Sequence, residues 1–508
     1  MQVNRLESRL EQWLSPLKAT VEGQSLCALE NRPEILPAAQ LCINSKQLKD
    51  GDIFLALPGV SGHGNQFIEV ALLQGAALVI TDQLLPGQNE LAEDPRVLLW
   101  PDLAAALPAV VSRFYQDAAS QLKLVGITGT NGKSSTAIFV NQLSRLLGER
   151  AAVIGTLGYG EFPTFTPLQN TTPHLVDLHK IFSGMRANGC QLVAMEVSSH
   201  ALIQQRVAGL EFAVAVFTNL SHDHLDYHGT MEAYFDAKAM LFQPTLANAA
   251  VINVSDEYGK KLAALTPLQT LAYGRLADCQ GFTRFLAYDH LQTDGHGFRC
   301  QLHSHLGHFQ LHIPLLAEFN VQNVLAAMGA QLLLGHDLSD IVKAVSRLAA
   351  VPGRMEQLLF PDDVSVVIDY AHTPDALQQS LVALRQQSRG RLWCVFGCGG
   401  DRDKAKRPVM GRIAEQYADH VIITADNPRT EAVIDICNDI AAGMVTGANC
   451  QIETDRESAI KLALIEAHAG DMILVAGKGH ESYQVIGSTV RDYDERKFIN
   501  SLLAEMCR

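Results

Sequence analysis

The sequence predicts an α/β protein built from three domains. Its 508 residues are too many for a single hydrophobic core. Apolar runs of strand length alternate with helical patterns through most of the chain, which is typical of parallel sheets covered by helices. Near residue 122 a strand, a glycine-rich turn and a helix follow one another and open a central domain. We therefore expect domains at residues 1–115, 116–349 and 350–508.

Each segment contributes its own strands. The first contains short runs between polar turns (GDIFLAL, AALVITD and RVLLW), which predict a small α/β domain. In the second, LVAMEV, AVAVFTN and AAVINV predict a mostly parallel sheet, residues 270–314 an antiparallel edge, and residues 321–334 a helix. The third holds four candidates, SVVIDYAH, LWCVFGCGG, HVIITADNP and DMILVAGKG. Each ends in polar or glycine-rich residues, where open α/β sheets bind ligands.

The turn at residues 126–136 reads GITGTNGKSST and has the layout of a phosphate-binding loop. Glycines let backbone N–H groups point at phosphate oxygens, and the helix N-terminus adds partial positive charge. Lys133 would reach the β- and γ-phosphates, and Ser134 would bind Mg²⁺. The spacing departs from the usual one, because Ile127 stands where the first glycine is expected. The alternative is a glycine-rich turn with a surface lysine.

Composition excludes several classes of protein. Hydrophobic residues make up 47% and charged residues 19%, as in a folded soluble protein. The net charge of −14 argues against a nucleic-acid partner. No apolar run of about 18 residues predicts a membrane span, and the first 17 residues lack the apolar core of a signal peptide. The ten cysteines show no paired spacing, so we expect reduced thiols and a cytoplasmic location.

Two clusters follow the loop in the central segment. Glu196 ends an apolar strand, where a carboxylate needs a partner, and a Mg²⁺ near Ser134 would be one. A capped or ion-paired glutamate is the alternative. Residues 222–228, HDHLDYH, place three histidines and two aspartates within seven residues. They could form a zinc site, a polar loop, or a loop in which one histidine helps to hold a metal shared with a nucleotide.

Two further features leave alternatives open. Lys238 lies in an otherwise apolar helix, where burial favours the neutral amine. A neutral amine can react with CO₂ to give an anionic carbamate, but the lysine could also simply extend to solvent. Four histidines alternate along a predicted strand, and we expect an exposed strand face there rather than a metal site. They are His303, His305, His308 and His312.

Charged side chains gather at strand ends in the third segment. GGDRDKAKRP carries Arg402, Lys404, Lys406 and Arg407, with Arg412 nearby; TADNPRTE adds Asp426, Asn427 and Arg429; AGKGHESY adds Lys478 and Glu481. Arginine binds a carboxylate in bidentate fashion, and an acid binds an ammonium, so the set suits a small zwitterion. A solvated charged rim is the alternative.

These motifs, in this order, resemble those of the Mur ligases, and most of all the members that use meso-2,6-diaminopimelate. The resemblance covers nearly the whole chain through GITGTNGKSS, QNTTP, MEVSSHAL, NLSHDHLDYH, the AK of YFDAKAMLF, GRME, DYAHTPDAL, GCGGDRD, DNPR and GKGHE. The longer phosphate loop is the form of that family. The resemblance implies an N-terminal domain that binds the UDP end of a substrate, a central phosphate-loop domain that binds ATP, and a Rossmann-like C-terminal domain that binds the incoming amino acid.

The resemblance also implies roles for individual residues. ATP would be bound by Gly129, Thr130, Asn131, Gly132, Lys133, Ser134, Ser135, Asn320, Arg354, Asp369 and His372. Mg²⁺ would be bound by Ser134, Glu196, His224 and a carbamylated Lys238, with Lys133, Lys238 and His224 as catalytic residues. The UDP-sugar-peptide would contact Ile43, Ser45, Val60, Ser61, Gly62, Asn170, Thr171, Thr172, Ser198, Gln204 and Arg206. Diaminopimelate would contact Arg402, Asp426, Asn427, Pro428, Arg429, Gly477 and Glu481.

The chain departs from the family pattern at two places. Asn44-Ser45-Lys46 stands where Asp-Ser-Arg is usual, and Ala317 or Glu318 stands where a glycine usually precedes Phe319-Asn320. The implied reaction is ATP-dependent addition of meso-diaminopimelate to the D-glutamate γ-carboxylate of UDP-N-acetylmuramoyl-L-alanyl-D-glutamate through an acyl phosphate, by a monomer. A lysine-adding Mur ligase and a folylpolyglutamate synthase are the nearest alternatives. A nucleotide-binding regulatory protein without catalysis is a more distant one.

Overall fold

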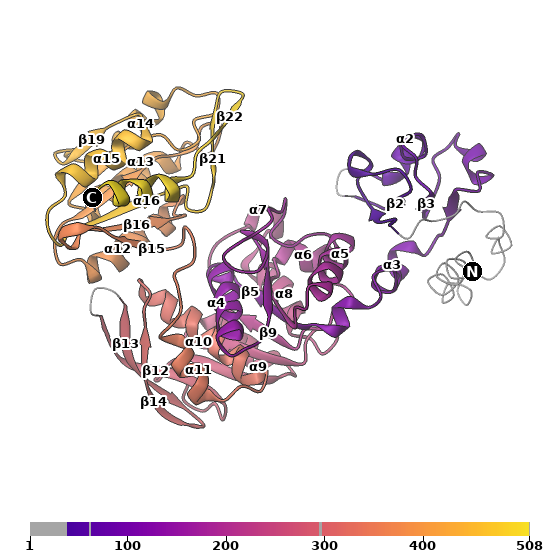
Figure 1. Ribbon diagram of the computed structural model, residues 1–508, viewed down its shortest axis with the longest axis horizontal. Helices are drawn as coiled ribbons and strands as arrows, with labels where there is room; N and C mark the ends of the chain where they lie inside the picture. Colours follow the sequence, from indigo (N-terminus) through magenta and orange to yellow (C-terminus); the bar gives the residue numbers. More distant parts are fainter. Residues whose placement is uncertain (1–37, 60–61, 294–296, 507–508) are drawn as a thin grey trace.

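The computed structural model describes residues 38–59, 62–293 and 297–506, and within them the chain forms three layered α/β units in succession (Figure 1). The predicted fold class is confirmed. The expectation about a signal peptide falls on residues 1–17, and Val60 and Ser61 also lie outside the described residues. None of the described helices is both long enough and apolar enough to span a bilayer.

The first unit is a small parallel sheet with the strand order β1-β2-β3-β4. Its strands are β1 (Leu41–Cys42), β2 (Ile53–Ala56), β3 (Leu78–Thr81) and β4 (Val97–Leu99), and its helices are α2 (Ile68–Leu73) and α3 (Leu103–Phe114), with short 3₁₀ turns at Ser45–Gln47, Gly64–Phe67 and Asn89–Ala92. β2 and β3 are buried throughout, as parallel strands covered on both faces are. Leu175 and Val176 of the second unit complete this core, so the two units are packed together.

The second unit is a long sheet with the order β14-β13-β12-β11-β10-β9-β5-β8-β6-β7. Its strands are β5 (Lys123–Thr128), β6 (Ala151–Gly155), β7 (Gly158–Gly160), β8 (Leu192–Glu196), β9 (Val214–Phe217), β10 (Ala249–Asn253), β11 (Gln269–Arg275), β12 (Phe285–Thr293), β13 (Phe298–Ser304) and β14 (Gly307–Ile313). Pairing along the sheet is parallel from β6 to β12 and antiparallel from β12 to β14. The antiparallel edge predicted for residues 270–314 is therefore confirmed from β12 onward but is wrong for β11, which pairs in parallel with both neighbours.

Helices cover both faces of this sheet, and successive side chains along a strand point to opposite faces. Val125 and Ile127 of β5 pack in the core with α4, α10 and α11, whereas Leu124 packs in the core with α5, α6, α8 and α9. These helices are α4 (Lys133–Leu146), α5 (Leu175–Ala187), α6 (Ser199–Ile203), α8 (Met231–Ala239), α9 (Glu257–Leu265), α10 (Glu318–Leu333) and α11 (Leu338–Val345), with α7 (Leu225–His228) and 3₁₀ turns at Ala118–Gln121 and Met240–Phe242. The helix predicted over 321–334 is α10.

The third unit is a sheet with the order β15-β16-β20-β17-β18-β19, parallel except for β15. Its strands are β15 (Glu356–Leu359), β16 (Ser365–Asp369), β17 (Leu392–Phe396), β18 (His420–Ile423), β19 (Cys450–Ile452) and β20 (Met472–Ala476), beside a separate hairpin of β21 (Tyr483–Ile486) and β22 (Thr489–Asp492). Helices α12 (Pro374–Gln387), α13 (Lys406–Tyr417) and α14 (Val433–Ala441) cover one face, and α15 (Arg456–Glu466) and α16 (Glu495–Met506) the other; a 3₁₀ turn spans Pro361–Asp363. The four predicted strands are β16, β17, β18 and β20.

Candidate active site

The phosphate loop connects β5 to α4, as the sequence predicts. Gly129 has φ 149° and Gly132 has φ 83°, a region that favours glycine. A Cβ atom on Gly129 would lie 1.9 Å from Thr218 Oγ1, and one on Gly132 would lie 2.4 Å from Asn323 Oδ1. Both positions therefore need glycine for conformation and for space.

Residues after β9 hold the loop in shape. The backbone N–H groups of Thr130 and Asn131 donate to the carbonyl and side-chain oxygens of Asn219, each at 2.9 Å. Thr218 Oγ1 donates to the Asn131 carbonyl at 2.6 Å. Sequence reasoning missed both residues, although their place at the end of a strand was a signal, since β9 is the neighbour of β5 in the sheet.

Lys133 begins α4, and its amine folds back onto the loop. Its Nζ donates to the carbonyls of Gly129 and Thr130, both at 2.8 Å. Burial lowers the pKa of this amine. Ser134 and Ser135 follow in the buried first turn of the helix. A phosphate entering the loop would offer the amine an anionic partner in place of two neutral carbonyls.

Glu196 lies at the end of β8 and beside the loop, because it pairs in register with Ile127 of β5. The side chain is buried, and its two oxygens accept from the Thr156 backbone N–H at 2.8 Å and the Thr156 hydroxyl at 3.2 Å. These neutral donors do not neutralise the carboxylate. A buried carboxylate next to a phosphate loop and a serine hydroxyl fits Mg²⁺, which takes few protein oxygens alongside phosphate and water.

Lys238 of α8 is buried and reaches the same loop. Its Nζ donates to the Gly129 carbonyl at 2.9 Å and lies 4.5 Å from the centre of the Tyr234 ring. Burial, together with the nearby Lys133, holds the pKa of this amine well below its usual value. The environment therefore favours the neutral amine, which is the form that can react with CO₂.

His224 begins α7 in a left-handed conformation, φ 53°, and its side chain is about half exposed. Its ring lies 5.0 Å from the ring of His200 and 6.1 Å from that of Tyr234, which brings it to the side of α8 that carries Lys238. Within the described residues, no three His, Cys, Asp or Glu side chains are placed to bind a metal by themselves. A metal at this place would therefore need further ligands, such as phosphate oxygens or a carbamate, beside the protein side chains.

The histidine-rich strands form a hairpin edge, and the expected exposed face is confirmed in part, since His305 and His308 are exposed whereas His303 and His312 are half-buried. His303 and His308 face each other across β13 and β14 with ring centres 4.8 Å apart, and His303 Nε2 lies 2.9 Å from Asp289 Oδ1.

The residues predicted to contact the UDP-sugar-peptide lie in two units, and those of the second unit lie around Glu196 and Thr172. Thr172 Oγ1 donates to the Glu196 carbonyl at 2.9 Å and accepts from the Ser198 backbone N–H at 3.1 Å. The Arg206 guanidinium donates to the Thr172 carbonyl at 2.8 Å and to Gln204 Oε1. Thr171 is 3.0 Å from the Thr156 hydroxyl, and Asn170 precedes it at the surface. In the first unit, Ile43 and Ser45 follow β1, and Gly62 lies in the turn after β2.

The remaining predicted ATP contacts lie on two units. Asn320 of α10 is buried; it donates to the Leu316 carbonyl at 2.8 Å and accepts from Asn323 at 3.1 Å, and Asn323 in turn contacts α4 through Thr136. Its amide is thus already satisfied within the protein.

Asp369, at the end of β16, accepts from the Met355 backbone N–H at 3.1 Å and the Ser380 hydroxyl at 2.7 Å. Burial raises the pKa of this carboxyl. Arg354 stacks on Tyr370 at 4.6 Å, and its Nε is buried without a hydrogen-bond partner in the described part of the chain. The His372 ring lies 4.6 Å from that of Tyr370. A buried guanidinium nitrogen without an acceptor suits an anionic ligand.

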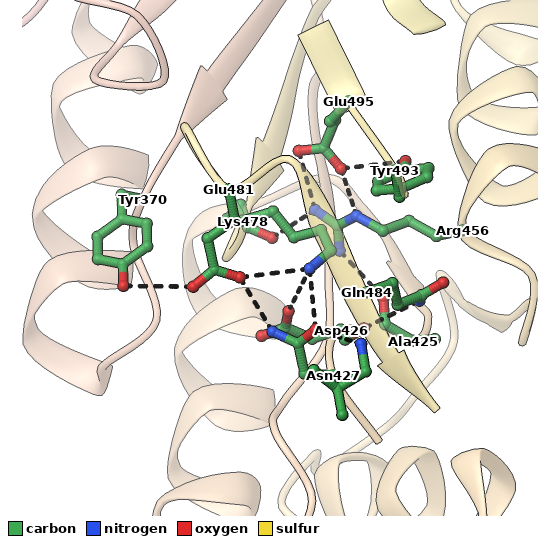
Figure 2. Close-up of polar contacts among 12 residues, drawn as sticks. Tyr370, Ala425, Asp426, Asn427, Arg456, Lys478, Glu481, Gln484, Tyr493 and Glu495 are labelled. Carbon is green, nitrogen blue, oxygen red and sulfur yellow. Dashed lines mark hydrogen bonds and ion pairs between the residues drawn. The ribbon is translucent and has the colours of Figure 1, made fainter. Parts of the chain in front are cut away.

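The residues predicted to contact the amino acid lie at the carboxyl ends of β17, β18 and β20. Asp426, Asn427 and Pro428 are buried after β18, and Gly477 and Glu481 follow β20 (Figure 2). Arg429 has φ 49°, donates to the Gly400 carbonyl at 2.8 Å, and lies close to Gly399, as does Arg402. The two arginines and the acids therefore lie at one end of the sheet.

Arg407 does not belong to this pocket. It is fully buried and binds Glu431 at 2.9 Å and Asp439 at 2.9 Å. Hydrogen bonds from Arg407 and from Lys404 hold the pKa of Glu431 far below its usual value. Arg407 therefore anchors α13 to α14 and to the turn before it.

The fold and the loop define a phosphate-loop protein of the nucleotide-dependent class, with a separate Rossmann-like third unit. Family models match in three places: "Mur ligase family, catalytic domain" at residues 38–115, "Mur ligase middle domain" at 127–331 and "Mur ligase, glutamate ligase domain" at 353–479. The chain belongs to the Mur ligase family, and it is an ATP-dependent ligase that forms amide bonds.

Two curated relatives carry the name UDP-N-acetylmuramoyl-L-alanyl-D-glutamate–2,6-diaminopimelate ligase. The protein of Synechococcus elongatus is 43% identical over 468 residues, 91% of this chain and 93% of its own. That of Haemophilus influenzae is 40% identical over 481 residues, 93% of this chain and 98% of its own. A solved structure with the same name has a TM-score of 0.68 at 36% identity and covers 92% of this chain and 95% of its own. A folylpolyglutamate synthase of Mycobacterium tuberculosis, 18% identical with a TM-score of 0.57 over 73% of this chain and 91% of its own, shares the fold.

Proposed function

We propose that this chain adds meso-2,6-diaminopimelate to UDP-N-acetylmuramoyl-L-alanyl-D-glutamate in the synthesis of peptidoglycan precursors. The observation that carries the proposal is the 43% identity, over 91% of the chain, to a ligase whose name states these substrates. The paired arginines and acids at the end of the third sheet support it, because diaminopimelate carries a complete amino-acid head at its far end.

The reaction has two steps. An oxygen of the D-glutamate γ-carboxylate attacks the γ-phosphorus of ATP; a new O–P bond forms, the bond to the β-phosphate oxygen breaks, and ADP leaves. The neutral amine of diaminopimelate then attacks the acyl carbon, phosphate leaves with the bonding pair, and the nitrogen loses a proton. Positioning and charge neutralisation account for most of the catalysis of such transfers.

The chain supplies these effects from named residues. Lys133 would move from the loop carbonyls to the β- and γ-phosphates, and Arg354 would offer its unpaired nitrogen to the nucleotide. Ser134 and Glu196 would hold one Mg²⁺, and His224 with a carbamylated Lys238 a second. When bound, Mg²⁺ offsets the charge of the phosphate oxygens and of the attacking carboxylate. Thr172, Ser198, Gln204 and Arg206 would orient the peptide end of the UDP substrate.

The test is phosphate release from ATP with each substrate omitted in turn, with the product identified by mass spectrometry. The proposal expects release only when the UDP-linked dipeptide and meso-diaminopimelate are both present. Comparable turnover with lysine would instead indicate a lysine-adding ligase. The monomeric state and the cytoplasmic location remain predictions, which light scattering and cell fractionation would test.

A further inference from the structure

One lysine at the end of the third sheet is fully buried. Lys478 lies between Gly477, with φ 115°, and Gly479, with φ 52°. A Cβ on Gly479 would lie 2.7 Å from Tyr370 Cβ and 2.8 Å from the Gly353 carbonyl oxygen. The two glycines thus let the turn pack so tightly that the lysine points inward. A buried ammonium is costly unless it is paired, so its partners define its role.

Those partners all belong to the predicted amino-acid pocket (Figure 2). Lys478 Nζ lies 3.2 Å from Asn427 Oδ1, 3.4 Å from Glu481 Oε2 and 3.5 Å from Asp426 Oδ1. Asn427 Nδ2 also donates to Glu481 Oε2 at 3.0 Å. The lysine and the asparagine together fix one oxygen of Glu481, while its other oxygen lies 3.5 Å from the Tyr370 hydroxyl.

The charges in this group do not cancel. Two carboxylates, Asp426 and Glu481, share one ammonium. Asp426 Oδ1 is buried and accepts no hydrogen bond within the described residues, although it faces Lys478. The adjacent buried ion pair of Arg456 and Glu495 is neutral as a pair. The group therefore has one negative charge and one acceptor to spare, which suits a ligand ammonium.

Hydrogen bonds from Arg456 and from the β21–β22 hairpin fix the backbone around this group. Arg456 donates to the carbonyls of Ala425 at 3.2 Å and Ala476 at 2.9 Å, the residues just before Asp426 and Gly477. From the hairpin, Gln484 Nε2 donates to the Asp426 carbonyl and the Val485 N–H donates to Asn427 Oδ1, both at 2.9 Å. Asn427 Oδ1 thus accepts from both the hairpin and Lys478, so the lysine is part of the same rigid frame.

We infer that Lys478 is a positioning residue of the amino-acid site: it holds Asp426, Asn427 and Glu481 in the arrangement that receives the ammonium of the incoming amino acid. The inference rests on the proposed function. Because its side chain is fully buried while Glu481 is partly exposed, Lys478 acts on the ligand through the acids. Without it, two neighbouring carboxylates would repel each other and Glu481 would lose its fixed orientation.

The experiment compares Lys478→Met, which keeps the length of the side chain, with Lys497→Met. Lys497 is a matched control because it lies in the same unit, is 85% exposed and pairs with Asp494 at the surface. For Lys478→Met we expect the KM for diaminopimelate to rise about 30-fold or more, since a buried group is left unpaired. The KM values for ATP and the UDP substrate should stay within about twofold in both variants. An unchanged KM for diaminopimelate, or equal losses for all three substrates, would overturn the inference.

A double-mutant cycle keeps the test decisive if Lys478→Met folds poorly. Lys478→Met/Glu481→Gln removes a cation and an anion together and should fold better than the single lysine variant. We expect its loss in kcat/KM for diaminopimelate to be clearly smaller than the product of the two single losses, because the lysine would act in part through the glutamate. Losses that simply multiply would contradict this. Failure of the wild-type protein to use diaminopimelate would instead refute the proposed function, independently of these variants.

Discussion

Lysines lie at the centre of both proposed sites, but their contacts differ in charge: neutral carbonyls at one site and carboxylates at the other. Beside the phosphate loop, Lys133 and Lys238 donate to backbone carbonyls and share that of Gly129. Neither forms an ion pair within the described ranges of the chain. Lys478 in the third unit instead touches two carboxylates.

The difference shows that the environment, more than the residue type, sets what a lysine can do. Near the loop, burial lowers the pKa of both amines, and Lys133 lowers that of Lys238 further, so each lysine lacks an anion in direct contact and would gain one from phosphates or from a carbamate. In the third unit, Lys478 contacts two carboxylates, Asp426 and Glu481, which could also pair with a second cation. The loop site is therefore complementary to anions, and the acids around Lys478 are complementary to an ammonium, while Arg402 and Arg429 beside them suit a carboxylate.

The largest expected effect is at Lys133. Lys133→Ala should abolish measurable ligation, a loss of about 10³-fold or more, because it removes the side chain proposed to offset charge on the moving phosphoryl group. Its thermal unfolding midpoint should stay near that of the wild type, since the amine contacts only two loop carbonyls. Phosphate release and product formation measure the effect, and a folded variant with substantial turnover would disprove the role.

Variants of Lys238 test whether this side chain acts as an anionic carbamate. Lys238→Ala should lose about 10²-fold or more in kcat, and acetate should restore part of it by supplying a carboxylate at the vacated place. Lys238→Arg should show no recovery, because a guanidinium stays cationic. Rates are measured over a series of acetate concentrations, with Lys133→Ala as the control that acetate should not restore. Near-normal turnover of the arginine variant would mean that the lysine acts as a simple cation.

Arg429 tests the charge arrangement of the other site. Lysine lacks the far carboxylate of diaminopimelate and would leave the half-buried Arg429 guanidinium without that partner, and a site built to bind a substrate group rejects an analogue that lacks it. The wild type should therefore prefer diaminopimelate strongly. Arg429→Ala should reduce kcat/KM for diaminopimelate about 10²-fold and affect lysine much less, so that most of the preference disappears.

Ligation assays with both amino acids, on the wild type and on Arg429→Ala, give the ratio of kcat/KM for diaminopimelate to that for lysine. Lys404→Ala is a suitable control, since Lys404 is 66% exposed and pairs with Glu431 outside the pocket. If the wild type uses lysine comparably, or if the ratio survives in Arg429→Ala, the pocket is assigned wrongly.

The sequence predicted the fold class and the strands that carry the site, because apolar runs ending in glycine or polar residues identify covered parallel strands. It also placed Lys133, Glu196 and Lys238 near a common loop, and the register of Ile127 with Glu196 shows why: residues at the ends of adjacent parallel strands meet. Local sequence patterns could not predict contacts between side chains that depend on the order of strands in the sheet.

Three examples show this limit. Asn219 supports the loop only because β9 lies next to β5, and Thr156 binds Glu196 only because β6 lies next to β8. Arg407 looked like the other cations of its segment, but Glu431 and Asp439, more than 20 residues away, bury it. The short edge strands β15 and β19 gave no clear sequence signal.

The smallest predicted effect lies between the two sites, at Ala317. It precedes α10, which carries Asn320 toward the loop, and it packs in the core of the third unit with Met355 and Val367. Its backbone has φ 68° and ψ 129°, a conformation that favours glycine and costs an alanine about 1–3 kcal/mol. Replacing it with glycine relieves that strain but loses a buried methyl, about 0.8 kcal/mol, and gains freedom in the unfolded chain, about 0.4–1 kcal/mol.

These contributions nearly cancel, so Ala317→Gly should change the free energy of unfolding by less than about 1 kcal/mol. Ala326→Gly is the matched control: Ala326 is also fully buried, but it lies within α10 without a positive φ. There, lost helix propensity adds to the lost methyl, and we expect a cost of about 2 kcal/mol. Urea unfolding followed by circular dichroism compares the two variants. Equal destabilisation would show that Ala317 is not strained, and that the departure from glycine at this position carries no cost where the loop-bearing unit meets the amino-acid-binding one.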